Sequence, residues 1–176
     1  MVKVLDKEFD LYMSRSEIQA IVDRLASEIT RDYKDKNPLI CPVLTGSYLF
    51  AADLTRAIGF DHEVSFVRYS SYSGMSSTGC VKESLPFPKS CTGRHVIIVE
   101  DVVDTGVSME CMLHRLKALN PASVAICSFL FKPGCFHKDF KIDYVGKSIP
   151  DDFVVGYGLD YNEMGRTLSE VYSLHQ

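Results

Sequence analysis

Residues 96–108 read VIIVEDVVDTGVS, and this run indicates the architecture of the chain. Four apolar, mostly β-branched residues open it, as in a buried strand. Glu100 and Asp101 follow, and a third carboxylate, Asp104, leads into a Thr-Gly-Val-Ser segment. Apolar residues then recur at helical spacing between positions 109 and 119, which predicts a helix that opens at this segment. We therefore expect the carboxylates to leave the carboxyl end of a strand, where open α/β sheets bind their ligands.

The same run places a possible anion site next to a group of carboxylates. A helix N-terminus with a glycine and two hydroxyls can hold a phosphate through its free backbone N–H groups. Glu100, Asp101 and Asp104 can hold sugar hydroxyls, a hard cation or a proton. Together these features suggest a phosphorylated sugar as the ligand. The alternative is an ordinary acidic loop, but three carboxylates this close repel one another, so stability alone would not favour them.

The rest of the chain alternates helical and strand patterns. Residues 14–34 predict an amphipathic helix that opens with capping-box spacing between Ser14 and Glu17. A second helix is expected at 48–58, and strands are expected at 39–44, 62–69, 123–131, 144–146 and 153–156. The serine- and glycine-rich stretch 70–94 predicts a loop that could hold a short hairpin. This alternation predicts one α/β domain with a parallel sheet and right-handed crossovers.

Composition argues against several classes of protein. The 176 residues suffice for one well-buried domain, and 46% hydrophobic with 24% charged residues is typical of a soluble globular protein. A net charge of −4 argues against a general nucleic-acid or membrane-surface binder. No run approaches the roughly 18 apolar residues of a membrane span, and the N-terminus lacks a signal-peptide core. Six cysteines without a C-x-x-C pair argue against zinc and fit a reducing cytosol.

Several segments, taken in order, resemble one known family. Residues 100–106 (EDVVDTG) resemble the ribose-phosphate signature of type I phosphoribosyltransferases, and residues 43–47 (VLTGS) are similar to their pyrophosphate loop. Residues 70–74 (SSYSG), with STG at 77–79, are similar to the mobile loop of the hypoxanthine-guanine branch. Lys132 follows a strand, as the base-reading lysine does, and residues 153–161 with Arg166 resemble the C-terminal base and metal segment. The ordered set is specific to the purine branch.

The resemblance implies a fold and a reaction. The fold would be α/β, a parallel β-sheet flanked by helices, with a core at about residues 37–145 and a small hood from about residues 1–13 and 146–176. The reaction would be purine salvage: Mg²⁺-dependent transfer of ribose 5-phosphate from phosphoribosyl pyrophosphate to N9 of hypoxanthine or guanine. We expect a cytoplasmic homodimer or homotetramer, with neither nucleic acid nor membrane as partner. The alternative is a regulatory protein of the same fold that senses nucleotides and binds nucleic acid.

The resemblance also implies roles for individual residues. Ribose 5-phosphate would be held by Glu100, Asp101, Asp104, Thr105, Gly106, Val107 and Ser108, and Mg²⁺ by Glu100, Asp101 and Asp160. Pyrophosphate would be bound by Leu44, Thr45, Gly46 and Arg166, and the base by Lys132, Phe153, Val154 and Asp160. Ser71 and Tyr72 would belong to the mobile loop, and Asp104 would be the general acid or base at the purine N7.

Some of these roles compete with simpler ones. Asp104, Thr105 and Ser108 could serve only as caps of the following helix. Thr45 stands where many family members carry lysine or arginine, so pyrophosphate would rely on the loop backbone, Mg²⁺ and Arg166. The Leu44–Thr45 peptide bond stands where the family often has a cis bond, and the sequence is compatible with either cis or trans. A lysine donor at the base favours 6-oxopurines over adenine, because the adenine 6-amino group would meet an ammonium.

Overall fold

A five-stranded parallel sheet forms the centre of the computed structural model, which describes residues 1–71 and 81–175. The strand order is β4-β3-β7-β8-β9, and each neighbouring pair is parallel. The strands are β3 (Leu39–Pro42), β4 (Glu63–Val64), β7 (His95–Val103), β8 (Ser123–Phe131) and β9 (Tyr144–Ser148). The parallel sheet predicted from the alternating pattern is confirmed.

Strand β7 lies in the middle of this sheet and is longer than predicted. It pairs with β3 on one side and with β8 on the other, and residues 96–99 are fully buried, as a central parallel strand requires. Because β8 is equally long, the ladder continues through Glu100 to Val103. Glu100 and Asp101 therefore lie inside the strand, and the prediction that all three carboxylates follow it was wrong. Only Asp104 lies beyond its end.

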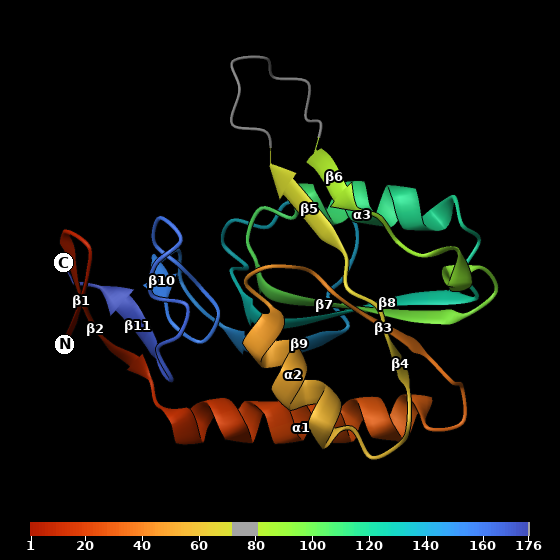
Figure 1. The fold of residues 1–176 in the computed structure, drawn as a ribbon, viewed down its shortest axis with the longest axis horizontal. Coiled ribbons are helices and arrows are strands. Elements are labelled where there is room, and N and C mark those ends of the chain that lie inside the picture. Colours follow the sequence, from red (N-terminus) through yellow and green to blue (C-terminus); the bar gives the residue numbers. More distant parts are fainter. Residues whose placement is uncertain (72–80, 176) are drawn as a thin grey trace.

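Helices cover both faces of the sheet (Figure 1). Helices α1 (Arg15–Tyr33) and α2 (Tyr48–Ala57) pack on one face, and α3 (Val107–Lys117) packs on the other. The predicted capping box opens α1: the Ser14 hydroxyl accepts from the Glu17 N–H, and the Glu17 carboxylate accepts from the Ser14 N–H. Among the described residues, no helix combines the length and apolar character that crossing a bilayer requires.

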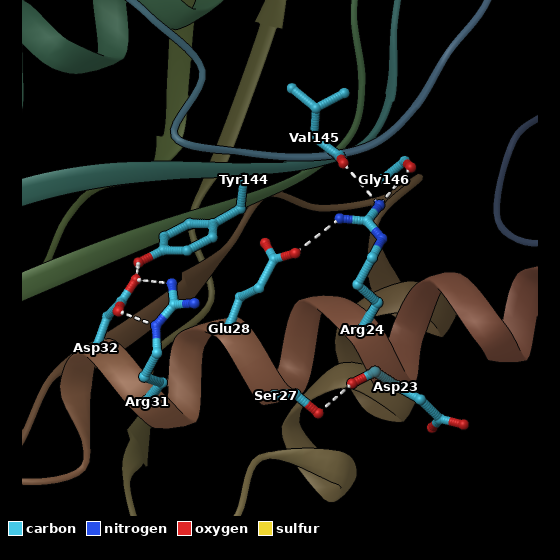
Figure 2. Close-up of polar contacts among 9 residues, drawn as sticks. All are labelled: Asp23, Arg24, Ser27, Glu28, Arg31, Asp32, Tyr144, Val145 and Gly146. Carbon is cyan, nitrogen blue, oxygen red and sulfur yellow. Dashed lines mark hydrogen bonds and ion pairs between the residues drawn. The ribbon is translucent and has the colours of Figure 1, made fainter.

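Polar side chains of α1 hold the edge strand β9 in place (Figure 2). Arg24 donates to the carbonyl oxygens of Val145 and Gly146 at 2.9 and 2.7 Å. In the last turn of the helix, Asp32 accepts a 2.9 Å hydrogen bond from the Tyr144 hydroxyl. These contacts tie the first three residues of β9 to the helix. The chain that continues from β9 toward the C-terminal segment therefore starts from a fixed position.

A second sheet is built from both ends of the described chain. Its order is β1-β2-β11-β10 with antiparallel pairing throughout, from strands β1 (Val2–Val4), β2 (Lys7–Met13), β10 (Val154–Val155) and β11 (Val171–Leu174). Figure 1 shows it to the left of the main sheet, where the red and blue segments meet. This sheet is the hood that the resemblance implied. Sequence analysis did not identify β1, β2 or β11, because β1 and β11 are short and β2 reaches its second partner, β11, only through a distant segment.

The prediction of one strand at residues 62–69 was wrong. β4 ends early, and β5 (Arg68–Ser71) leaves the main sheet to pair antiparallel with β6 (Val81–Leu85). The neighbouring strand β3 ends at Pro42, which accepts from the Val67 N–H but has no N–H to donate in return. The parallel ladder therefore cannot continue regularly. A short 3-10 helix, η1 (Lys89–Cys91), follows β6, and the hairpin considered for residues 70–94 is present as β5 and β6.

Candidate active site

A cavity of about 450 Å³ opens at the carboxyl ends of β3 and β7. Its lining includes many of the predicted site residues, namely Leu44, Thr45, Gly46, Glu100, Asp101, Asp104, Thr105, Gly106, Val107, Ser108, Asp160 and Arg166. Strands of a parallel sheet present their carboxyl ends at one edge, so the topology brings the segments 44–46 and 100–108 together. The hood adds the segment that carries Asp160 and Arg166.

The turn between β7 and α3 presents free backbone donors to this cavity. Gly106, with φ of 79°, is the N-cap of α3, so neither Asp104 nor Thr105 occupies the capping position. The Thr105 hydroxyl lies 3.5 Å from the Val107 nitrogen, which is long for a hydrogen bond. A Cβ at Gly106 would lie 2.7 Å from the Phe136 ring, so a larger residue would not fit. The first turn of α3 is therefore suited to bind an anion.

Two partly buried carboxylates form the wall of the cavity next to this turn. Burial raises the pKa of Glu100 well above its ordinary value, and the neighbouring charge of Asp101 raises it further. Burial also raises the pKa of Asp101, although hydrogen bonds to Glu100 and the 2.8 Å bond from the Val102 N–H oppose that shift. Such a desolvated oxygen pair gains from a hard cation, which would neutralise both charges. The donor set therefore fits Mg²⁺.

The loop after β3 is packed between one of these carboxylates and the hood. A Cβ at Gly46 would lie 1.5 Å from Oδ2 of Asp101, so the backbone runs directly against the carboxylate. On its other side, a Cβ at Gly158 would lie 1.9 Å from the Gly46 carbonyl oxygen, and Gly158 has φ of 101°. The Leu44–Thr45 peptide bond is cis. The loop backbone is thus fixed from two sides at the edge of the cavity.

Arg166 and Asp160, both lining the cavity, are bound to each other. Nη2 of Arg166 lies 2.8 Å from Asp160 and 2.9 Å from Glu163, and its Nη1 donates to the Gly158 carbonyl oxygen at 2.9 Å. With its side chain only 17% exposed, Arg166 is a well-fixed forked donor for a phosphate group. Asp160 also accepts from the Glu163 N–H at 2.8 Å, so each of its oxygens has one partner and keeps a lone pair that could bind a cation.

Lys132 approaches Asp104 from the neighbouring strand. The Lys132 N–H donates to the Val103 carbonyl oxygen at 3.0 Å, which sets the residue after β8 beside the end of β7. Its ammonium lies 3.1 Å from Asp151 and 3.7 Å from Asp104, and the side chain is 12% exposed. Lys132 lies outside the lining of the 450 Å³ cavity but is joined to it through Asp104. A fixed ammonium next to a carboxylate can donate to a carbonyl oxygen of a ligand.

The hood contributes an exposed aromatic ring. Phe153 is 45% exposed, and its ring centroid lies 5.9 Å from that of Tyr161 and 6.4 Å from that of Phe9. Val154, by contrast, is buried and pairs with Ser173 between β10 and β11. Neither Phe153 nor Val154 belongs to the lining of the 450 Å³ cavity. A ring supported by two others but open on one side can stack on a flat ligand.

The expected mobile loop is only partly covered by the structure. Ser71 is the last residue of β5, and Tyr72 lies outside the described residues. Tyr69 of β5 is buried and lines the cavity, although the sequence analysis did not identify it. The only available signal was its position directly before residues 70–74, the segment that resembles the family's mobile loop. That position was read as part of a strand of the main sheet.

Two further residues near Asp104 were also missed. The Cys135 sulfur and carboxylate oxygens of Asp104 and Asp151 lie within 4.8 Å of one another. Cys135 follows a Pro-Gly pair after Lys132, and such a pair predicts a tight turn. That signal would have indicated that Cys135 folds back toward the end of β8, but not what it meets there.

Comparisons with known proteins cover almost the whole chain. The family model described as "Phosphoribosyl transferase domain" matches residues 14–162. The chain is 44% identical over 159 residues to a hypoxanthine phosphoribosyltransferase of Buchnera aphidicola, covering 89% of this chain and 90% of that protein. It is 40% identical over 169 residues to a hypoxanthine-guanine phosphoribosyltransferase of Mycobacterium tuberculosis, covering 92% and 84%. A crystal structure of a hypoxanthine-guanine phosphoribosyltransferase from Bacillus anthracis matches with a TM-score of 0.90 at 35% identity, covering 97% of this chain and 100% of that one.

Proposed function

The chain belongs to the phosphoribosyltransferase family, as a purine-salvage enzyme of its hypoxanthine-guanine branch, and from this membership we propose its reaction. It transfers ribose 5-phosphate from phosphoribosyl pyrophosphate to N9 of hypoxanthine or guanine and releases pyrophosphate. One observation carries the proposal: a single site joins a helix N-terminus with a glycine cap, a partly buried carboxylate pair and a fixed ammonium. These groups match a phosphate, a ribose and a 6-oxo group.

The two phosphate-bearing ends of the sugar donor bind at different places. The 5-phosphate binds the backbone N–H groups at the start of α3, where Gly106 allows close approach. The pyrophosphate binds the backbone of residues 44–46, which lies against the same cavity. Because Thr45 brings no positive charge, Arg166 supplies the forked cationic donor for this group.

The carboxylate pair serves the ribose between these two ends. Glu100 and Asp101 accept hydrogen bonds from the ribose hydroxyls, directly or through a bound cation. Mg²⁺ held by Glu100 and Asp101, and a second Mg²⁺ held by Asp160, would supply positive charge to the pyrophosphate. Negative charge next to the sugar also favours the oxocarbenium-like character that develops at the anomeric carbon.

The base binds between the end of β8 and the hood. Lys132 donates to the 6-oxo group, and Phe153 stacks on the purine ring. As N9 bonds to the anomeric carbon, the Asp104 carboxylate accepts the proton carried by N7, and the bond to pyrophosphate breaks. An ammonium at the 6-position selects 6-oxopurines because the adenine 6-amino group is itself a donor.

The test is an activity assay on the purified protein with phosphoribosyl pyrophosphate, Mg²⁺ and each purine base in turn. We expect nucleotide formation with hypoxanthine or guanine, little with adenine, loss of turnover with excess chelator and recovery on adding Mg²⁺. Adenine turnover comparable to hypoxanthine would contradict the base site, and full activity in chelator would contradict the metal. Nucleotide binding without turnover of any base would favour the regulatory alternative.

We also propose that the enzyme is cytoplasmic and forms a homodimer or homotetramer, as the family resemblance implies. Sedimentation of the purified protein gives the mass of the assembly. A monomer at micromolar concentration would contradict the proposed assembly without affecting the assignment of the reaction.

A further inference from the structure

A tight turn after β8 brings a thiol to the proposed acid–base residue. The Cys135 N–H donates to the Lys132 carbonyl oxygen at 3.2 Å, which closes the turn over the Pro-Gly pair. Lys132 and Cys135 therefore project from neighbouring positions toward the same carboxylates. The Cys135 sulfur and the carboxylate oxygens of Asp104 and Asp151 lie within 4.8 Å of one another. The cluster thus contains two acceptors, one ammonium and one thiol.

The thiol in this cluster is a hydrogen-bond donor. Desolvation and its hydrogen bonds to Asp104 and Asp151 raise the pKa of Cys135, so the sulfur keeps its proton at neutral pH. A metal ion held by this cluster is disfavoured, because the Lys132 ammonium already lies 3.1 and 3.7 Å from the two carboxylates. A metal would also need the thiolate form of the cysteine. The geometry therefore fits a neutral donor shared between two acceptors.

This donor is needed most when the base is bound. In the reaction proposed above, the Lys132 ammonium also donates to the purine, so Asp104 must share it with Asp151 and the ligand. We propose that Cys135 is a positioning residue that holds the Asp104 carboxylate toward N7 while Lys132 engages the base. This inference rests on the proposed function, because Cys135 would act only through the proposed roles of Asp104 and Lys132.

The test compares Cys135→Ala, which removes the donor, with Cys135→Ser, which keeps one. Steady-state kinetics with hypoxanthine should show kcat of Cys135→Ala reduced roughly two- to tenfold, the loss expected for one hydrogen bond. The KM for phosphoribosyl pyrophosphate, whose phosphates bind elsewhere in the cavity, should stay unchanged. Cys135→Ser should recover most of kcat. Cys111→Ala, which removes a partly buried thiol outside the cavity lining, is the matched control and should keep wild-type constants.

Two results would overturn the inference. The first is a wild-type kcat in Cys135→Ala. The second is an equal loss of kcat in the alanine and serine variants, because a side chain that only fills space would not need the hydroxyl donor of serine. If the melting curve shows that Cys135→Ala is unfolded, Cys135→Val fills the space without a donor and is compared with Cys135→Ser in the same way. Absence of turnover in the wild-type protein would instead contradict the proposed function. The wild-type assay therefore separates the two kinds of failure.

Discussion

The close approach of Gly46 to Asp101 makes Gly46→Ala a demanding test of the donor site. The added Cβ would lie 1.5 Å from Oδ2 and 2.6 Å from Cγ of Asp101. Unbonded heavy atoms need a separation of roughly 3.5 Å, so the carboxylate or the loop must move by about 2 Å. The variant therefore displaces either Asp101, which is proposed to bind the ribose, or the loop backbone, which is proposed to bind pyrophosphate. Both groups would contact the same substrate, phosphoribosyl pyrophosphate.

Both routes give a loss of similar size. Rotation of Asp101 would break its 2.8 Å hydrogen bond from the Val102 N–H, and a bond to a charged group contributes about 1.5–3 kcal/mol. Movement of the loop would misplace the pyrophosphate, and an error of about 1 Å near reacting groups can cost about 10²-fold. We expect kcat/KM for phosphoribosyl pyrophosphate to fall by roughly ten- to a hundredfold.

The assay varies phosphoribosyl pyrophosphate at saturating hypoxanthine, with a melting curve to establish that the variant is folded. Gly59→Ala is the matched control, because its Cβ would meet only the Thr30 side chain, at 3.2 Å, outside the cavity lining. This control should keep wild-type kinetic constants. A folded Gly46→Ala with unchanged kcat/KM for the donor would refute the reasoning that contact with Asp101 fixes this loop.

Three further predictions concern charged groups. Asp104→Asn should lower kcat by roughly 10²–10⁴-fold and leave the binding of phosphoribosyl pyrophosphate unchanged. Its melting temperature should hardly change, because Gly106 and not Asp104 caps α3. Near-normal turnover would reject the acid–base role. Glu100→Gln should raise the melting temperature at neutral pH without Mg²⁺, because the raised pKa of Glu100 means that its ionisation destabilises the folded state as pH rises. An unchanged or lower melting temperature would contradict this. Asp10 raises the pKa of His175, so this exposed pair stabilises the fold below pH 6.5 and loses its contribution as pH rises through the raised pKa. The difference in melting temperature between wild type and His175→Gln should therefore be small but measurable at about pH 5.5 and absent at about pH 9.

The elements with a local signal could be predicted from the sequence. Helix α1 carries both a capping box and an apolar stripe, and β8 is apolar from Val124 to Phe131 except for Ser128, so each is specified by its own residues. Three hood strands, β1, β2 and β11, were not identified from the sequence. β2 (KEFDLYM) alternates charged and apolar residues only over residues 8–11, a weak strand signal, and pairing with β1 and β11 extends the strand on both sides.

The same distinction holds for the site. The acidic run and the glycine at the start of α3 are contiguous in sequence, so one motif was enough to predict that they lie side by side in the site. The cluster around Cys135 did not follow, because Asp151 reaches Lys132 only after the chain has passed through β9. Nor did the ion pair between Arg166 and Asp160, which depends on the folded course of the hood segment. Contacts between side chains from separate segments require the three-dimensional arrangement.

The strand order of the hood has a consequence for folding during translation. β2 is made early, yet its partner β11 is made after every strand of the main sheet. Until β11 leaves the ribosome, the early hairpin has an open edge, and pairing it later requires closing a very long loop of chain. The main sheet and its phosphate-binding turn can form before that event, because their segments are complete sooner. A nascent chain would thus complete the turn before α3 and the Lys132 position first, and the hood residues Phe153 and Arg166 last.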